Sequence, residues 1–75
     1  MTHAEYYELD EHYTLALREA EDFLASTDYK VIKAAEGVDE LTEELKAQRQ
    51  AARDKVNEMR ANLEALWAQS GNLND

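Results

Sequence analysis

The chain has 75 residues, 17 acidic and 8 basic, and this formal charge of -9 argues against a nucleic-acid-binding surface. A chain this short forms one small domain, residues 1–75, and it has no cysteine to supply a disulfide or a cysteine-based metal site. Because self-association is the remaining common source of stability, we expect a homo-oligomer.

Charge is distributed unevenly along the chain. Residues 1–29 carry eight acidic side chains and a single basic one, Arg18, whereas residues 30–75 carry nine acidic and seven basic side chains. No apolar run approaches the ~20 residues that a membrane-spanning helix needs, and the first residues lack the basic start and apolar core of a signal peptide. We therefore expect an acidic first segment and no membrane partner.

The first predicted element is an amphipathic helix over residues 3–26. Its apolar side chains recur at spacings of three and four residues, which places them on one helical face. They are Tyr6, Leu9, Tyr13, Ala16, Ala20 and Phe23, with Leu17 and Leu24 widening the stripe. Tyr7 falls outside this stripe, and we predict that it contacts a protein outside the domain.

A turn is predicted next, built around a short helix over residues 28–36. Thr27 is placed as the N-cap of this helix and Asp28 as its first residue, where a carboxylate favours the positive end of the helix dipole. Gly37 is predicted to end it in the left-handed conformation. Asp39 is then expected to cap the following helix.

The last predicted element is a long helix over residues 40–69, ended by Gly71 and followed by a frayed tail over residues 71–75. Its heptad pattern predicts a seam that packs against a partner helix. The seam positions are Thr42, Leu45, Arg49, Ala52, Val56, Met59, Leu63, Leu66 and Ser70. We expect Arg49 to reach the rim or to pair with an acid from the facing helix, such as Glu19 or Glu21.

These elements predict an all-α fold: a helical hairpin of two long antiparallel helices joined by a short helix, with a coiled-coil-like seam. Since the last helix is predicted to be longer than the first, its final turns should be incompletely covered within one chain. We therefore predict a protein interface on that strip, joined by Tyr7. The strip residues are Val56, Met59, Leu63, Leu66 and Trp67.

Catalytic and metal-binding patterns are weak. Glu8 and His12 lie four residues apart with Glu5 one turn earlier, but an exposed Glu-to-His pair is ordinary helix surface and no second ligand cluster accompanies it. The two glycines, Gly37 and Gly71, are too far apart for a phosphate-binding loop. We expect a non-enzymatic protein with no cofactor and no metal.

Two stretches nevertheless resemble a known family. Phe23-Leu24-Ala25-Ser26-Thr27-Asp28-Tyr29 precedes Arg49-Gln50-Ala51-Ala52-Arg53-Asp54. This arrangement is similar to the C-terminal part of bacteriophage tail assembly chaperones and tail-fibre assembly proteins, where a Leu-Leu-x-x-Thr-Asp-aromatic element precedes an Arg-Gln-x-x-Arg-Asp helix. The resemblance covers residues 18–57. Its family-motif positions are Thr27, Asp28, Tyr29, Arg49, Gln50, Arg53 and Asp54.

The resemblance implies a phage structural or tail-assembly protein that acts through helix–helix packing. Its partners would be phage tail or virion proteins, and it would work in the host cytoplasm during assembly, with the virion as a second location. Two alternatives remain open from the residues alone. One is an acidic inhibitor of a host protein that mimics nucleic-acid charge, and the other is a small coiled-coil adaptor.

Overall fold

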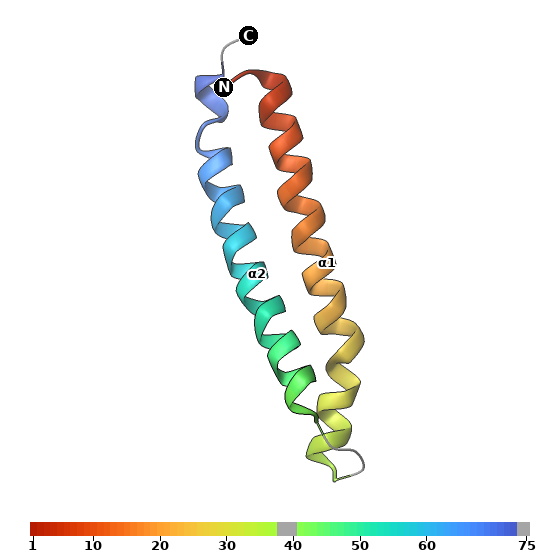
Figure 1. The fold of residues 1–75 in the computed structure, drawn as a ribbon. Helices are drawn as coiled ribbons and strands as arrows, with labels where there is room; N and C mark the ends of the chain where they lie inside the picture. Colours follow the sequence, from red (N-terminus) through yellow and green to blue (C-terminus); the bar gives the residue numbers. More distant parts are fainter. Residues whose placement is uncertain (38–40, 74–75) are drawn as a thin grey trace.

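The computed structural model describes residues 1–37 and 41–73, which form an antiparallel hairpin of two helices (Figure 1). Helix α1 spans His3–Ala35 and helix α2 spans Glu43–Trp67, followed by a short 3₁₀ helix, η1, over Ser70–Asn72. The molecule measures 57 × 16 × 14 Å, and no strand occurs in these residues. The predicted all-α helical hairpin is confirmed.

Helix α1 is continuous, so the predicted break between residues 26 and 28 and the separate short helix over residues 28–36 are wrong. Thr27 and Asp28 are interior residues of α1 rather than a cap and a first residue. The Thr27 hydroxyl lies 2.9 Å from the carbonyl oxygen of Phe23, one turn earlier, where it bonds back to the helix instead of opening a new one. The apolar spacing also continues through this region, at Val31 and Ala34.

Both helices begin at a threonine. Thr2 caps α1: its hydroxyl accepts the Glu5 N–H at 3.2 Å while the Glu5 carboxylate accepts the Thr2 N–H at 3.3 Å, which forms a capping box. Thr42 caps α2 and accepts the Leu45 N–H at 3.1 Å. Asp39, the predicted cap of this helix, lies outside the described residues.

The two glycines differ in their roles. Gly37 follows the C-terminus of α1 with a φ of 78°, and its N–H donates to the Ala34 carbonyl at 3.1 Å, so this predicted stop is confirmed. Gly71 does not end α2, because the helix already ends at Trp67 and Gly71 lies inside η1 without a positive φ. The predicted frayed tail over residues 71–75 thus begins within a 3₁₀ turn, and its residues 74 and 75 lie outside the described residues.

The seam of α2 faces α1, as the heptads predicted. Its buried residues are Ala52, Val56, Met59, Leu63 and Leu66, joined by Ala20 and Thr27 from α1. In the middle of the hairpin, Ala20, Ala52 and Val56 form a cluster of small residues, which lets the helices approach closely. Leu17, Phe23 and Leu24 pack around this cluster.

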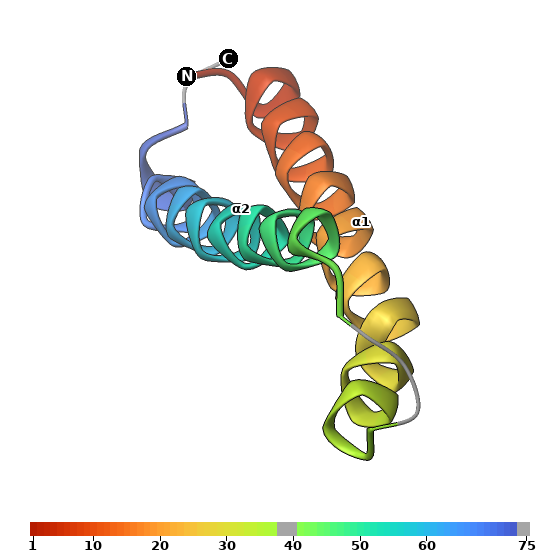
Figure 2. The same ribbon diagram turned by 60° about the horizontal axis from the view of Figure 1, so that its bottom comes forward.

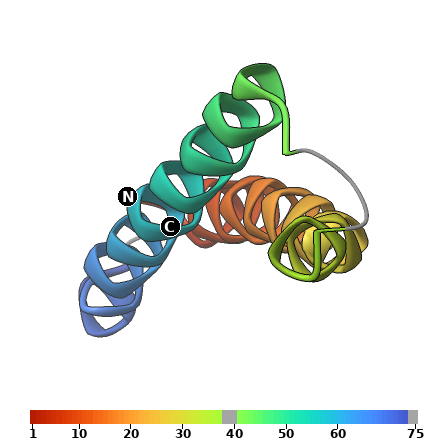
Figure 3. The same cartoon turned by 90° about the horizontal axis from the view of Figure 1, so that it is seen from below.

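The relative lengths of the helices are the reverse of the prediction. Helix α1 has 33 residues and α2 has 25, so the longer arm is the first one. Figures 2 and 3 show the last turns of α1 lying away from the start of α2. In the part of the chain that the structure describes, neither helix combines the length and apolar character needed to cross a membrane.

Candidate functional site

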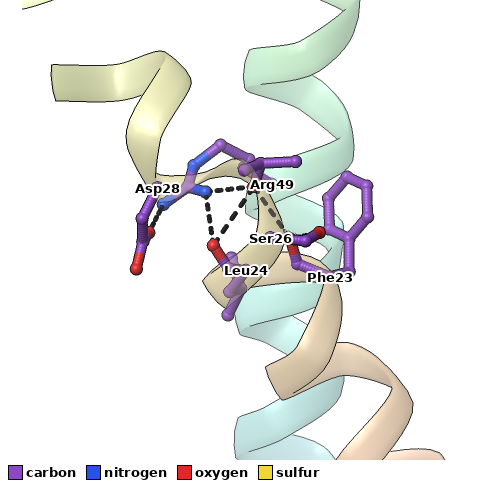
Figure 4. Close-up of polar contacts among 6 residues, drawn as sticks. Phe23, Leu24, Ser26, Asp28 and Arg49 are labelled. Atoms are coloured by element: carbon purple, nitrogen blue, oxygen red, sulfur yellow. Dashed lines mark hydrogen bonds and ion pairs between the residues drawn. The ribbon is translucent and has the colours of Figure 1, made fainter. Parts of the chain in front are cut away.

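The most developed polar site joins the two helices near the loop end of the hairpin (Figure 4). We call it the Arg49 clasp, and it consists of Arg49 from α2 with Leu24, Thr27 and Asp28 from α1. Arg49 Nη1 donates to the Leu24 carbonyl at 3.0 Å and to the Thr27 hydroxyl, and Nη2 donates to Asp28 Oδ1 at 2.9 Å. One guanidinium group therefore binds three successive acceptors along α1.

Arg49 is well suited to this position because its planar guanidinium presents several donors at fixed angles. Its side chain is only 12% exposed, whereas that of Asp28 is 61% exposed. The positive charge of Arg49 is thus nearly buried beside the seam, and the carboxylate of Asp28 balances it from the solvent side. The predicted pairing of Arg49 with an acid of the facing helix is confirmed, but the acid is Asp28 rather than Glu19 or Glu21. Glu21 instead lies 3.6 Å from Arg60.

The clasp brings together residues from the two segments that carry the family resemblance. Thr27 and Asp28 lie in the first segment and Arg49 begins the second. The remaining motif residues of α2 are exposed and bond to one another: Arg53 donates to Gln50 Oε1 at 2.8 Å and Gln50 donates to Asp54 Oδ1 at 2.9 Å.

A groove of about 440 Å³ opens beside the clasp, where the ends of the two helices diverge. Tyr29, the aromatic residue of the motif, lines it and is 53% exposed. Lys33 Nζ lies 5.6 Å from the centre of the Tyr29 ring, within the range of a cation–π contact. The other lining residues are Lys30, Thr42, Glu44, Leu45 and Gln48.

The interface strip predicted from the sequence is mostly buried within a single chain. Leu63 and Leu66 are each 3% exposed, and Val56 and Met59 are also buried. The reason is the register of the helices: α2 ends beside Asp10, so the first turns of α1 extend past the whole strip. These four residues are therefore core residues of the hairpin, and the prediction that they are left uncovered is wrong.

Trp67 is the exception, since it remains 51% exposed. Its indole N–H donates to Asp10 Oδ2 at 3.0 Å, and the other oxygen of Asp10 accepts the Thr14 hydroxyl at 3.2 Å. This contact joins the helices near the termini, while the Arg49 clasp joins them near the loop. The two polar contacts lie toward opposite ends of the buried seam and form in the same register of the two helices.

Sequence reasoning missed most of a second apolar face on α1, which lies away from the buried seam and, at Tyr29, borders the groove beside the clasp. Its large side chains are Tyr7, Leu15, Tyr29 and Ile32, which are 65%, 51%, 53% and 58% exposed. Their spacing places them on one face with Ala25, Arg18 and Asp22 between them. We call this set the outer stripe. Charged residues interrupt this stripe, so its apolar spacing is not evident in the sequence. Only Tyr7 was predicted to lie off the inner face.

Among the described residues, no three metal-ligating side chains converge on one point. Glu5, Glu8 and His12 line a shallow depression on α1, as their spacing suggested. Comparison of the chain with protein-family models, curated proteins and solved structures finds no match.

Proposed function

We propose that the chain is a non-enzymatic bacteriophage structural or tail-assembly protein that acts by helix–helix packing. The observation that supports this most directly is the Arg49 clasp. Two separate sequence segments suggested the family, and Thr27, Asp28 and Arg49 from these segments bond to one another across the hairpin. These contacts give the motif residues of both segments one structural role, which is to hold the two helices together.

In this role the partner is a phage tail or virion protein, and the chain works in the host cytoplasm during assembly. The groove next to the clasp offers a partner an aromatic ring at Tyr29 and positive charge at Lys30 and Lys33. These groups suit a helix that carries apolar and acidic side chains.

Deletion of the gene tests the proposal. If the protein assembles tails, electron microscopy of lysates should show particles lacking tails or tail fibres, and a plasmid copy of the wild-type gene should restore them. Normal infectious particles after deletion would contradict an assembly role. Mass spectrometry of purified virions separates a resident component, present at fixed stoichiometry, from an assembly factor that is released.

A second candidate function is inhibition of a host protein by mimicry of nucleic-acid charge. Glu8 and Glu11 favour it, since both are exposed on α1. Glu21 is less suitable, because its carboxylate lies 3.6 Å from the Arg60 guanidinium. Binding of this kind should weaken steeply as salt increases and should be lost when Glu8 and Glu11 are changed to lysine. Binding that is insensitive to both would exclude it.

A further inference from the structure

The hairpin has a thin core. Among the described residues, no side chain is less than 2% exposed, and the buried apolar set consists of six residues. Small domains bury a small share of their surface and commonly gain stability by associating. The outer stripe meanwhile leaves Tyr7, Leu15, Tyr29 and Ile32 in water on the same long helix.

The charges on α1 indicate what covers this stripe. The N-terminal part of the helix carries Glu5, Glu8 and Glu11 and no lysine or arginine. The C-terminal part carries Lys30 and Lys33; of its two acids, Asp28 pairs with Arg49 and Glu36 lies at the end of the helix. Two copies of α1 packed in parallel would place acid beside acid and base beside base. Packed antiparallel, the acidic part of each copy meets the lysines of the other.

The outer stripe also matches itself in one antiparallel register. When Arg18 faces Asp22 of the second copy, the two-fold symmetry forms this pair twice. In the same register Leu15 lies opposite Ala25, which joins a large side chain to a small one. Neither Arg18 nor Asp22 makes an ion pair within the described part of its own chain.

The ends of the stripe match as well. In this register Tyr7 of one copy lies next to Ile32 and Lys33 of the other, so that an aromatic ring meets an aliphatic side chain and an ammonium group. Glu11 lies opposite Tyr29, whose hydroxyl can donate to the carboxylate. Each of the four large apolar side chains of the outer stripe then has a counterpart in the second copy.

We propose that the protein forms an antiparallel two-fold dimer through the outer stripe of α1, centred on reciprocal Arg18–Asp22 pairs. The partner of this surface is a second copy of the same chain. This differs from the protein interface expected at the Trp67 end, and it does not depend on the phage role. Because the dimer uses Tyr29 and Lys33, a partner bound in the groove beside the clasp would compete with the second copy.

Sedimentation equilibrium of the full chain tests the surface with two matched variants. Leu15 and Trp67 are equally exposed at 51%, so Leu15→Lys and Trp67→Lys make comparable changes on the two competing surfaces. Leu15→Lys should weaken dimerisation about tenfold or more, because it places a charge in the centre of the contact. Trp67→Lys should leave the dimer intact. Circular dichroism at low concentration should show that both variants remain helical.

A charge exchange and a cross-link test the register. Arg18→Asp should weaken the dimer, because it sets a second carboxylate against Asp22 of the other copy. The double variant Arg18→Asp with Asp22→Arg should restore dimerisation. Since the chain has no cysteine, Arg18→Cys chains mixed with Asp22→Cys chains should form a mixed disulfide more readily than Arg18→Cys chains with themselves.

Several results would overturn the proposal. A wild-type chain that stays monomeric up to hundreds of micromolar would exclude the dimer, and loss of association in Trp67→Lys alone would move the contact to the termini. Self-linking of Arg18→Cys in preference to the mixed disulfide would indicate a parallel pair.

Discussion

Arg49 occupies a seam position that an apolar residue would normally hold, and its surroundings explain how the charge is tolerated. The guanidinium bonds to the Leu24 carbonyl, the Thr27 hydroxyl and the Asp28 carboxylate, and these acceptors lie within two turns of α1. A buried donor with good partners stabilises modestly, whereas a buried donor without partners is costly. At the residue scale, Arg49 therefore selects the alignment of α1 that supplies its acceptors.

Arg49→Ala should destabilise the hairpin by about 1–3 kcal/mol, because it removes several hydrogen bonds of a charged group from a nearly buried position. Asp28→Ala should cost about 1 kcal/mol or less, since Asp28 is mostly exposed and its ion pair is weakened by solvent. Urea unfolding at one fixed protein concentration measures both values. Equal losses for the two variants would contradict the burial argument.

The two glycines allow a matched backbone test. A Cβ added at either Gly37 or Gly71 would meet no atom within 4 Å, so only backbone conformation distinguishes them. Gly37→Ala should cost about 1–2 kcal/mol because its φ of 78° is unfavourable for alanine. Gly71→Ala should be neutral or slightly stabilising because alanine reduces the freedom of the unfolded chain. Thermal unfolding of the two variants checks the contrast.

At the scale of elements, the main feature is that α1 continues through residues 26–29. Thr and Asp are common at helix N-caps, yet here they are held inside a helix by packing and by the clasp. The side of α1 that carries Thr27 faces the seam of α2, so tertiary contact outweighs the local preference of these residues. The clasp forms in the same register in which the first turns of α1 enclose Leu63 and Leu66.

A proline at residue 28 separates the two interpretations of this segment. If Asp28 were the first residue of a separate helix, Asp28→Pro would be tolerated. Inside a continuous helix it should cost about 3 kcal/mol or more beyond the loss in Asp28→Ala, because proline removes a helical hydrogen bond and clashes with the preceding turn. Circular dichroism and urea unfolding of both variants provide the measurement, and similar stabilities would contradict a continuous α1.

At the scale of the whole molecule, stability depends on one layer of side chains between two helices. Cross-helix polar contacts lie near both ends, at Asp10–Trp67 and at the Arg49 clasp, with small residues packed between them. This arrangement leaves the remaining faces of each helix in solvent. A hairpin of this kind has much surface for partners and little core in reserve.

Leu63→Ala should therefore remove about 2–5 kcal/mol, the range for deleting a buried leucine side chain. This is a large share of the roughly 4–11 kcal/mol expected for 75 residues. Glu64→Ala is the control, since Glu64 is exposed at the next position and its replacement should change stability little. An unfolding free energy for Leu63→Ala equal to that of Glu64→Ala would place Leu63 outside the core.

Local sequence patterns were sufficient to predict the α-helices, the hairpin, the helix end at Gly37 and the inner seam. Apolar periodicity and the backbone freedom of glycine act over a few residues, so they can be read from the sequence. They did not predict that α1 is continuous, that Asp28 is the acid paired with Arg49, or that one chain buries Val56, Met59, Leu63 and Leu66. Those features depend on how far one helix extends along the other, and that is decided by the summed packing of both helices. The outer stripe became visible only once the inner face of α1 was known, since a helix side is outward only in relation to its partner.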